Sequence, residues 1–268
     1  QWILDFLNKP KGKKSTTPTG AWTRYRAKFL TNDNISKGAR FWRRYDSVLR
    51  RAEAEYGVPP EYVVAIIGVE TRYGGYMGKH RVIDALATLA FDYPRRSEFF
   101  TGELESFLIM SRDEGFDPFV PRGSYAGAMG VPQFMPDSFR IYAVDFDGDG
   151  RRDIWHNPVD VIGSVANYFA KKGKWQPGGP VTWPVTGVTA AHEPLIAAGA
   201  KPSLDPETLT AAGIRMDPTP PAGSKVSLMD FETHDGMEYW LGMDNFYAIM
   251  RYNPRTKYAM AVYQLSEA

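Results

Sequence analysis

The chain has 268 residues, of which 43% are hydrophobic and 24% are charged, so it is long enough to bury a substantial core. Its 32 basic and 31 acidic side chains give no net field that would favour a nucleic acid or an anionic membrane as a partner. The absence of cysteine excludes disulfides, thiolate nucleophiles and cysteine-ligated metals, and no apolar run approaches the ~20 residues of a membrane span.

The N-terminal part of the chain predicts a helical region. A short amphipathic segment at 2–7 is followed by KPKGKKSTTPTG at 9–20, a composition typical of an exposed loop. Aromatic and apolar residues then recur at helical spacing through 21–30 and 35–56, and Gly57 is expected to end the second helix. Tyr25 lies in the first of these helices, where an aromatic side chain is more often packed than exposed to a ligand.

The segment PPEYVVAIIGVETRYGG at 59–75 predicts a helix that is buried on all sides. Pro60 suits the first turn of a helix, and Glu61 suits the positive end of its dipole. Every residue from 62 to 69 is apolar or glycine, so the helix has no polar face. Glu70 falls in the last turn, and the two glycines at 74–75 favour the end of the helix.

Glu70 is a candidate for acid/base chemistry because of this placement. A carboxylate at the C-terminal end of a buried helix loses hydration and faces the negative end of the dipole, and both effects raise its pKa. An acid that stays protonated near neutral pH can donate a proton to a leaving group and take one back. The alternative is a helix-end glutamate paired with Arg72 or another cation, which is the commoner case for an arbitrary glutamate.

Two further helices are expected at 81–94 and 97–110, separated by a turn that carries Arg95 and Arg96. Adjacent arginines are usually solvated or salt-bridged, but in a cleft they can hold a carboxylate or polar sugar groups.

The segment GSYAGAMGVPQFMPDSF at 123–139 is rich in small residues. Such residues leave space beside the backbone, and Gln133 offers an amide with both donors and an acceptor. The segment could line a polar groove or serve as a tight packing element, and the residues alone leave both interpretations open.

The segment DFDGDGRRDIWHNPVD at 145–160 resembles the first half of a calcium loop, with aspartates at alternate positions and a glycine next. Position 12 of a standard loop falls on His156, which is a poor ligand for a hard cation, so a later carboxylate is expected to close the site. The expected ligands are Asp145, Asp147, Asp149, the backbone carbonyl of Arg151, and Asp160. The alternative is an acidic turn without an ion, held by neighbouring arginines.

The C-terminal part changes character. A helix is expected through 161–173, and beyond Trp175 frequent Pro and Gly favour short strands and loops. The segments VTWPVTGVT, KVSLMDFE and NFYAIMRYN are interpreted as strand-like, and KYAMAVYQL at 257–265 as a closing helix. The fold class expected is mainly α, of the α+β type. The expected domains are a helical region at 1–55 packed with the helix at 255–268, a core at 56–175, and a Pro/Gly-rich β-containing domain at 176–254.

Five blocks in order together resemble the lytic transglycosylases of the membrane-bound lytic transglycosylase B type. They are GVETRYG at 68–74, DALATLAFDYPRR at 84–96, GAMGVPQFMP at 127–136, VDFDGDG at 144–150 and GSVANYF at 163–169. The resemblance implies a lysozyme-like helical core with an additional helical region and a small β domain. It also implies cleavage of the β-1,4 bond between N-acetylmuramic acid and N-acetylglucosamine in peptidoglycan, with 1,6-anhydromuramic acid ends.

The resemblance also assigns roles to residues. Glu70 matches the catalytic acid/base of the family, and the family's EF-hand-like site matches the acidic loop. The residues that match expected substrate-binding positions are Ser124, Gln133, Tyr25, Arg95, Arg96, Tyr168, Tyr247 and Tyr252. Val131 and Pro132 stand where a flexible aromatic-glycine pair is expected, and the acidic loop is one residue longer than expected.

A mechanism with a single carboxylate is expected. An ordinary glycosidase uses two carboxylates, but Asp84 and Asp92, the nearest others in sequence, have the placement of caps or surface pairs. One carboxylate suffices if the substrate's own acetamido group is the nucleophile. The alternatives are a hydrolytic muramidase on the same fold and a non-catalytic glycan-binding module.

The expected cellular context follows from the substrate. Peptidoglycan places the protein in the bacterial periplasm, with no nucleic acid as partner. No cofactor is expected for the chemistry, and a structural Ca²⁺ is expected in the acidic loop. The N-terminus lacks a signal-peptide pattern, and membrane attachment is expected only through an upstream segment outside this chain.

Overall fold

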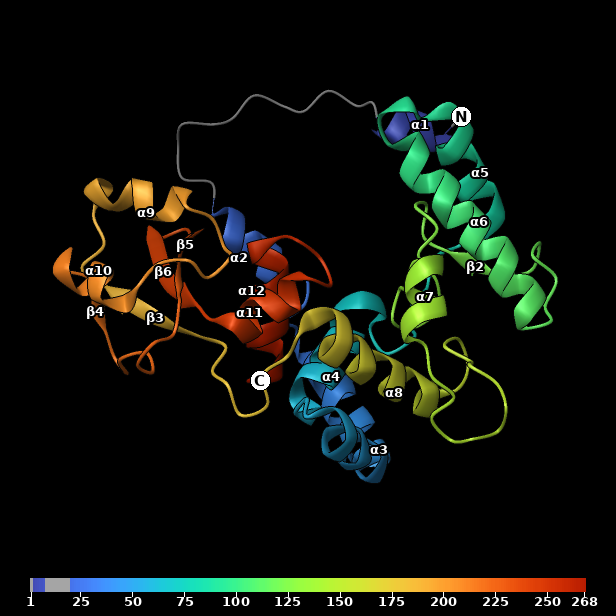
Figure 1. Cartoon of the computed structure of the whole chain (residues 1–268), viewed down its shortest axis with the longest axis horizontal. Helices are drawn as coiled ribbons and strands as arrows, with labels where there is room; N and C mark the ends of the chain where they lie inside the picture. The colour runs from blue at the N-terminus through green and yellow to red at the C-terminus, as the bar shows by residue number, and fades with distance from the viewer. Residues whose placement is uncertain (1, 8–19) are drawn as a thin grey trace.

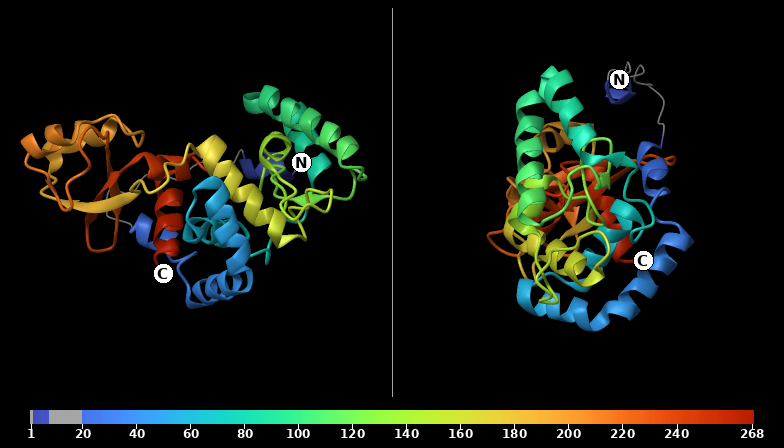
Figure 2. Two further views of the ribbon diagram at one scale, coloured as in Figure 1. Left: turned by 60° about the horizontal axis from the view of Figure 1, so that its bottom comes forward. Right: turned by 90° about the vertical axis from the view of Figure 1, so that its right-hand side faces the viewer.

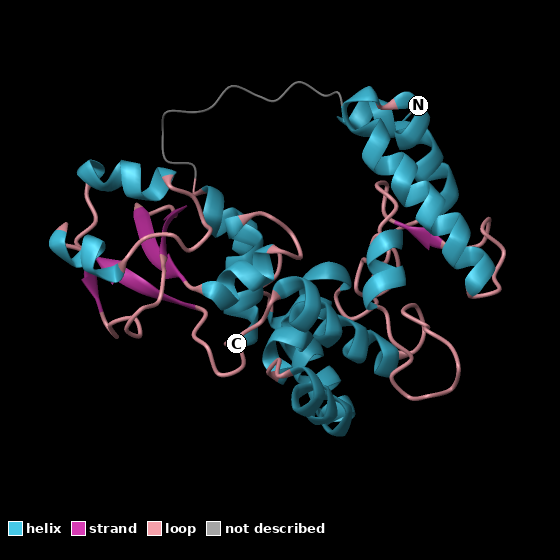
Figure 3. Cartoon of the chain, viewed as in Figure 1, coloured by secondary structure: helices cyan, strands magenta, loops and turns pink. Residues whose placement is uncertain are grey.

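The computed structural model describes residues 2–7 and 20–268 and is mainly helical, with a four-stranded antiparallel sheet and a two-stranded ribbon (Figures 1 and 3). The predicted loop at 9–20 lies outside the described residues except for Gly20. The α-helices are α1 Trp2–Leu7, α2 Ala21–Arg26, α3 Asn32–Tyr56, α4 Pro60–Thr71, α5 Val82–Asp92, α6 Ser97–Asp113, α7 Pro136–Tyr142, α8 Pro158–Tyr168, α9 Glu193–Ala197, α10 Pro206–Ala211, α11 Asp244–Met250 and α12 Thr256–Ser266. Short turns of other helix types are η1 Pro94–Arg96, η2 Phe169–Gly173 and η3 Ala190–His192. The strands are β1 His80–Arg81, β2 Arg122–Gly123, β3 Thr182–Thr186, β4 Arg215–Met216, β5 Ser227–Glu232 and β6 Met237–Gly242.

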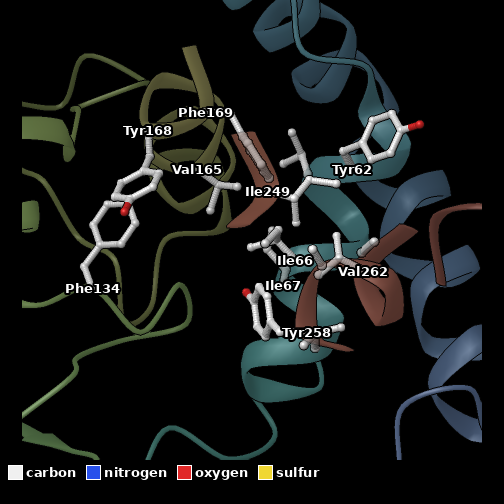
Figure 4. Packing of buried hydrophobic residues seen from close by; sticks show 14 of the residues in the cluster. Tyr62, Ile66, Ile67, Phe134, Val165, Tyr168, Phe169, Ile249, Tyr258 and Val262 are labelled. Carbon is white, nitrogen blue, oxygen red and sulfur yellow. The ribbon is translucent and has the colours of Figure 1, made fainter. Parts of the chain in front are cut away.

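Helix α4 lies at the centre of the molecule, as its all-round apolar sequence predicts. Every residue of α4 is buried except Glu61 and Glu70. Helices α3, α8 and α12 pack around it. Figure 4 shows Ile66 and Ile67 of α4 beside Tyr258 and Val262 of α12, all within one hydrophobic cluster. The predicted buried helix and the predicted closing helix are therefore both confirmed, and they form one packing unit.

The elements of the expected region 1–55 pack against three different parts of the molecule. Helix α1 packs on α5, α2 packs on β5 and α12, and α3 packs on α4 and α8. Gly57 ends α3 with a φ of 69°, the left-handed conformation expected of a glycine after a helix. The C-terminal helix thus contacts the N-terminal region through α2.

Helices α5 and α6 form a hairpin that packs on α7 (Figure 1). The short β1–β2 ribbon lies at the base of this hairpin, where His80 pairs with Gly123 and Arg81 with Arg122. The left-hand view of Figure 2 places the hairpin at the opposite end of the molecule from the four-stranded sheet. The central helices therefore lie between the hairpin and the sheet.

The sheet has the antiparallel order β4-β3-β6-β5 and its own small core. Val185 of β3 pairs with Tyr239 of β6, and Met229 of β5 pairs with Trp240. The buried side chains of this second core come from strands β3, β5 and β6, from helix α10 and from the loops around them. The strand predictions for VTWPVTGVT and KVSLMDFE are confirmed.

The strand-like interpretation of NFYAIMRYN is wrong, because residues 244–250 form helix α11. Its buried residues include Phe246, Ile249 and Met250, and this i, i+3, i+4 spacing is helical. Contacts with α12 and η2 select that spacing over the strand propensity of the individual residues. The Pro/Gly-rich region likewise contains two short helices, α9 and α10, in addition to the expected strands and loops.

None of the helices in the described part of the chain combines the length and apolar composition that crossing a bilayer requires.

Candidate functional site

The chain leaves α4 through three consecutive residues in the left-handed conformation. The φ angles are 52° at Arg72, 62° at Tyr73 and 81° at Gly74, so only one of the three positions has the residue that adopts this conformation without cost. The Thr71 hydroxyl accepts a hydrogen bond from the Gly74 N–H at 3.0 Å and donates one to the Val131 carbonyl at 3.0 Å. Thr71 thereby fixes both the turn after α4 and the segment that contains Val131.

Glu70 lies directly before this turn, and its carboxylate Oε1 accepts a hydrogen bond from the Tyr258 hydroxyl. Burial raises the pKa of Glu70 to about 7, and the hydrogen bond from Tyr258 opposes that rise. Near neutral pH a substantial fraction of Glu70 is therefore protonated. This is the state that a general acid needs.

Three further tyrosines lie close enough to Glu70 for its charge to affect their pKa values. Burial raises the pKa values of Tyr25, Tyr168 and Tyr252, and the negative charge of Glu70 adds to each rise. The Tyr168 hydroxyl donates to the Arg251 carbonyl at 2.9 Å, and the Tyr252 hydroxyl donates to the Pro132 carbonyl at 2.6 Å. The predicted positions Tyr25, Tyr168 and Tyr252 thus all lie within electrostatic reach of Glu70.

An aromatic cluster forms the side of the site next to α8. The rings of Tyr168 and Tyr252 are 4.7 Å apart, and Phe134 lies 5.4 Å from Tyr168 and 6.0 Å from Tyr252, measured between centroids. Figure 4 shows the rings of Phe134 and Tyr168 facing each other. Since the hydroxyls of Tyr168 and Tyr252 both donate to backbone carbonyls, these two rings are held in fixed orientations.

The segment at 123–134 folds back on itself beside the turn after α4. Its backbone forms bridges between Gly123 and Met129 and between Met129 and Phe134. The Ser124 hydroxyl accepts hydrogen bonds from the N–H groups of Ala126 and Ala128, at 3.2 and 3.0 Å. Ser124 therefore shapes this segment through local backbone contacts.

Gln133 has a positive φ of 52°, and its Nε2 donates to two carbonyls, that of Gly130 at 2.8 Å and that of Met77 at 3.2 Å. The Met77 contact joins the 123–134 segment to the chain that follows α4. These contacts occupy both donors of the amide, and they leave the carbonyl oxygen of Gln133 as the group available for a ligand.

The other predicted binding residues lie apart from this arrangement. Arg95 and Arg96 are exposed in η1, at the turn between α5 and α6, and the Arg96 guanidinium stacks on Phe99 at 4.1 Å. Tyr247 is half-buried on α11, with the Arg251 guanidinium 5.2 Å from its ring centroid.

Glu70 is the one carboxylate at this site within the described residues. The pKa of Glu70 is set by burial and by Tyr258, with no contribution from another carboxylate. Asp84 is exposed and pairs with Arg81 at 2.7 Å, and Asp92 is exposed at the end of α5. The geometry can therefore supply one proton-transfer group, which first donates and then accepts a proton.

Tyr258 is the residue at the site that the sequence reasoning missed. It lies in the first turn of α12, in a segment interpreted only as a closing helix. Its one signal was a tyrosine at the N-terminal end of an otherwise apolar helix, which packing alone explains equally well.

The acidic loop brings three carboxylates together. Ligand oxygens of Asp145, Asp147 and Asp149 lie within 4.8 Å of one another. Asp145 accepts hydrogen bonds from the N–H groups of Gly148 and Gly150, at 2.8 and 2.7 Å. Lost hydration raises the pKa of Asp145, but the N–H donors together lower it by more. The pKa of Asp145 is therefore below its usual value, and the carboxylate is ionised. Clustered ionised oxygens are the ligands that a hard cation such as Ca²⁺ takes.

Asp160 lies beneath the loop and is fully buried. Its Oδ1 accepts a hydrogen bond from the Phe146 N–H at 2.7 Å, and its Oδ2 accepts one from the Asp153 N–H at 2.8 Å. Asp160 therefore ties the start and the middle of the loop together, and each of its oxygens keeps a second lone pair.

The chain matches a known family over nearly its full length. Residues 4–267 match the family described as "Transglycosylase SLT domain". A curated relative, membrane-bound lytic murein transglycosylase B of Escherichia coli (strain K12), is 52% identical over 258 residues, which are 96% of this chain and 69% of the relative.

Solved structures agree with this match. Soluble lytic transglycosylase SltB1 from Pseudomonas aeruginosa has a TM-score of 0.90 and 47% identity, covering 99% of this chain and 86% of that one. The lytic transglycosylase Slt35 of Escherichia coli in complex with calcium has a TM-score of 0.86 and 48% identity, covering 99% and 81%. SltB3 from Pseudomonas aeruginosa, in complex with NAG-anhNAM-pentapeptide, has a TM-score of 0.82 and 32% identity, covering 98% and 69%.

Proposed function

The chain belongs to the family of proteins with a transglycosylase SLT domain, and we propose that Glu70 alone provides the acid/base chemistry of its reaction. The activity is that of a peptidoglycan lytic transglycosylase. The enzyme cleaves the β-1,4 bond between N-acetylmuramic acid and N-acetylglucosamine and leaves 1,6-anhydromuramic acid ends. The lysozyme-like helical core of the family agrees with this activity.

The proposed reaction has two proton transfers at one carboxyl group. Protonated Glu70 donates its proton to the glycosidic oxygen as that bond breaks, and the 2-acetamido carbonyl of the muramoyl residue attacks the anomeric carbon. Glu70, now a carboxylate, removes the proton from the muramoyl 6-hydroxyl. That oxygen then displaces the acetamido oxygen and closes the anhydro ring.

The observation that supports this proposal is a lone carboxyl group whose pKa is about 7. A group with a pKa near the working pH can both donate and accept a proton within one cycle. Tyr258 contacts Glu70 directly and is proposed to orient its carboxyl group. A mechanism with two carboxylates would need a second acid close to Glu70, and Asp84 is instead paired with Arg81.

The proposed substrate-binding set extends from Glu70 along the surrounding segments. Tyr25, Tyr168 and Tyr252 would contact the sugar next to Glu70, and the carbonyl oxygen of Gln133 would accept from its acetamido N–H. Ser124 would act by holding the 123–134 backbone. Arg95, Arg96 and Tyr247 are proposed to bind more distant parts of the glycan.

The test compares wild type with Glu70→Gln on purified sacculi, with product masses as the readout. We expect wild type to release anhydro products and Glu70→Gln to bind glycan without releasing them. Asp84→Asn, at an exposed ion pair, is the matched control and should retain activity. Turnover by Glu70→Gln would refute the assignment, and products heavier by one water would indicate a hydrolytic muramidase. Binding without any cleavage by wild type would indicate a glycan-binding module.

We propose that the acidic loop holds a structural Ca²⁺. Asp145, Asp147 and Asp149 would provide side-chain oxygens, Arg151 its backbone carbonyl, and Asp160 a second lone pair from below. The fit is supported by three carboxylates held within 4.8 Å, whose mutual repulsion a divalent cation would relieve. The ion would supply loop rigidity and no step of the reaction.

We also propose that the enzyme acts in the bacterial periplasm, where peptidoglycan lies. Its proposed partner is the glycan strand, without nucleic acid. Any membrane attachment would come from a segment outside these 268 residues.

A further inference from the structure

Two neighbouring helices each carry a buried glycine. They are Gly38 in α3 and Gly68 in α4, and the two helices pack side by side (Figure 1). A glycine inside a helix lowers the stability of the helix relative to alanine, so both positions call for an explanation. One side chain accounts for both. A Cβ on either glycine would lie less than 3.0 Å from the hydroxyl oxygen of Tyr73, closer than such atoms approach in proteins.

The side chain of Tyr73 fills the space between these helices. This space is called the glycine socket below and is formed by Gly38, Phe41 and Gly68. The ring of Tyr73 packs on that of Phe41 in α3, with the centroids 5.5 Å apart. A Cβ on Gly68 would also lie 3.0 Å from Cδ2 of Leu265, so α12 reaches the same point. The glycine socket thus lies where α3, α4 and α12 meet.

The backbone of Tyr73 also holds the end of α4. Its N–H donates a hydrogen bond to the Ile67 carbonyl at 3.3 Å. The N–H of Arg72 donates one to the Gly68 carbonyl at 3.1 Å. Tyr73 and Arg72 have φ angles of 62° and 52°, and residues other than glycine keep such left-handed conformations only where surrounding contacts hold them. The side chain of Tyr73 in the glycine socket is such a contact, and it fixes the turn that follows α4.

Glu70 lies in the last turn of α4, between Gly68 and Tyr73 in the sequence. We propose that Tyr73 is a positioning residue, which fills the glycine socket, holds the last turn of α4 and thereby keeps the Glu70 carboxyl group against Tyr258. Its hydroxyl lies against the two glycines, so Tyr73 acts through the chain that it holds and not on the substrate. The proposal rests on the proposed function, because it assigns the acid/base role to Glu70.

The test adds a methyl group to the α3 wall of the glycine socket. In Gly38→Ala the new Cβ would overlap the Tyr73 hydroxyl, whereas the next nearest side chain, that of Val64, lies at an ordinary 3.7 Å. A catalytic group that is misplaced by about 1 Å can lower the rate by about 100-fold. We expect kcat of Gly38→Ala on a soluble glycan fragment to fall about tenfold, because Glu70 shifts. KM should stay within about twofold of wild type, because the proposed binding tyrosines lie on other segments.

Tyr73→Phe decides whether that loss passes through Tyr73. It keeps the ring on Phe41 and removes the oxygen that the added methyl would meet, which leaves Cζ 3.2 Å from that methyl. The single variant should keep kcat within about twofold of wild type, and the double variant Gly38→Ala/Tyr73→Phe should recover most of the lost kcat. A double variant as slow as Gly38→Ala alone would overturn the proposal, because the methyl would then act through α3 itself. Wild-type kcat in Gly38→Ala would overturn it as well.

Tyr73→Gly separates the side chain from the turn. Glycine adopts the left-handed conformation without steric strain, so this variant suits the turn but empties the glycine socket. We expect kcat to fall about tenfold, with KM again within about twofold of wild type. Retention of wild-type kcat in Tyr73→Gly would contradict the proposal, because the filled socket would then not be needed.

Gly102→Ala is the matched control, since Gly102 lies inside α6 and a Cβ there has no atom of another described element within 4 Å. Its kcat and KM should equal those of wild type. All rates are divided by the folded fraction from circular dichroism, so that a loss of stability alone does not count as a loss of kcat. Failure of the proposed function is a separate result, because wild type would then release no anhydro products or Glu70→Gln would release them.

Discussion

The hydroxyl of Tyr258 donates a hydrogen bond to Oε1 of Glu70, and 188 residues of chain separate the two. The contact exists because α12 returns to pack on α4, so the last helix of the chain completes the site around Glu70, the proposed acid/base. A hydrogen bond to the charged form favours ionisation, whereas burial disfavours it. The balance leaves the pKa of Glu70 at about 7.

Replacing Tyr258 by Phe should move the pH dependence of the reaction. The Tyr258 hydrogen bond lowers the pKa of Glu70, so its loss raises that pKa above about 7. Because the first step needs the protonated acid, activity falls as pH rises through this pKa, and the alkaline limb should shift to higher pH. We expect a lower maximal rate as well, by about tenfold, from the loss of orientation. The measurement is kcat/KM against pH on a soluble glycan fragment.

Tyr263→Phe is the control for that experiment, because Tyr263 lies on the same helix and its ring packs edge-to-face against Trp240 of the sheet. Its profile should match wild type. An alkaline limb that stays in place for Tyr258→Phe would show that the hydroxyl does not tune Glu70.

Helix α4 and its carboxylate could be predicted because their signal is local. Pro60 marks the start, the apolar run at 62–69 leaves no polar face, and Glu70 is the single charged residue of the last turn. A prediction from local residue preferences is wrong at 244–250. The β-favouring residues there form helix α11, because packing against α12 and η2 favours the helix.

The remainder of the site depends on contacts between distant segments. Nothing near Tyr258 in sequence indicates Glu70 as its partner, since tertiary packing alone brings them together. Ser124 illustrates the opposite case. The sequence predicts it as a groove residue, which stays a prediction, and the structure adds that its hydroxyl oxygen accepts hydrogen bonds from backbone N–H groups of its own segment. The residue type at 124 predicts a polar side chain, but only the folded structure shows which groups its hydroxyl binds.

Thr71 should be needed for stability as well as for the shape of the site. In Thr71→Val the Val131 carbonyl and the Gly74 N–H lose their shared partner. Leaving fully buried groups unpaired costs about 1–3 kcal/mol, and these two are partly buried, so the free energy of unfolding should fall by about 1 kcal/mol in urea titrations. Thr71→Ser keeps the hydroxyl and should recover most of the loss. Equal stability of the Val and Ser variants would contradict this role.

Glu103 should make the protein less stable as pH rises. It is buried on α6, its Oε2 accepts a hydrogen bond from the Asp137 N–H at 3.0 Å, and burial raises its pKa from 4.5 to about 7. The folded state then binds more protons than the unfolded state between these values. The stabilising effect of the bound proton is full below about 4.5 and is lost as pH rises through about 7.

Glu103→Gln should therefore flatten the decline in unfolding free energy between pH 5 and pH 8, by as much as about 3 kcal/mol. Part of the decline remains because the pKa of Glu70 is raised in the same direction. Glu105→Gln, at an exposed position on the same helix, is the control and should follow wild type. A decline in Glu103→Gln as steep as that of wild type would exclude Glu103 as its source.

Removal of Ca²⁺ should lower the melting temperature. A ligand that binds only the folded state stabilises it by about 2.7 kcal/mol at a concentration 100 times its Kd, so chelation should remove a contribution of that order. The measurement is thermal unfolding with EDTA and with excess Ca²⁺. Asp147→Asn should show a much smaller difference between the two conditions, because one of the three clustered carboxylates is neutralised.

Asp117→Asn, in an exposed loop outside the cluster, is the control and should respond to chelation like wild type. Identical melting curves of wild type with and without Ca²⁺ would mean that the loop is held by its own hydrogen bonds, those that Asp145 accepts from Gly148 and Gly150.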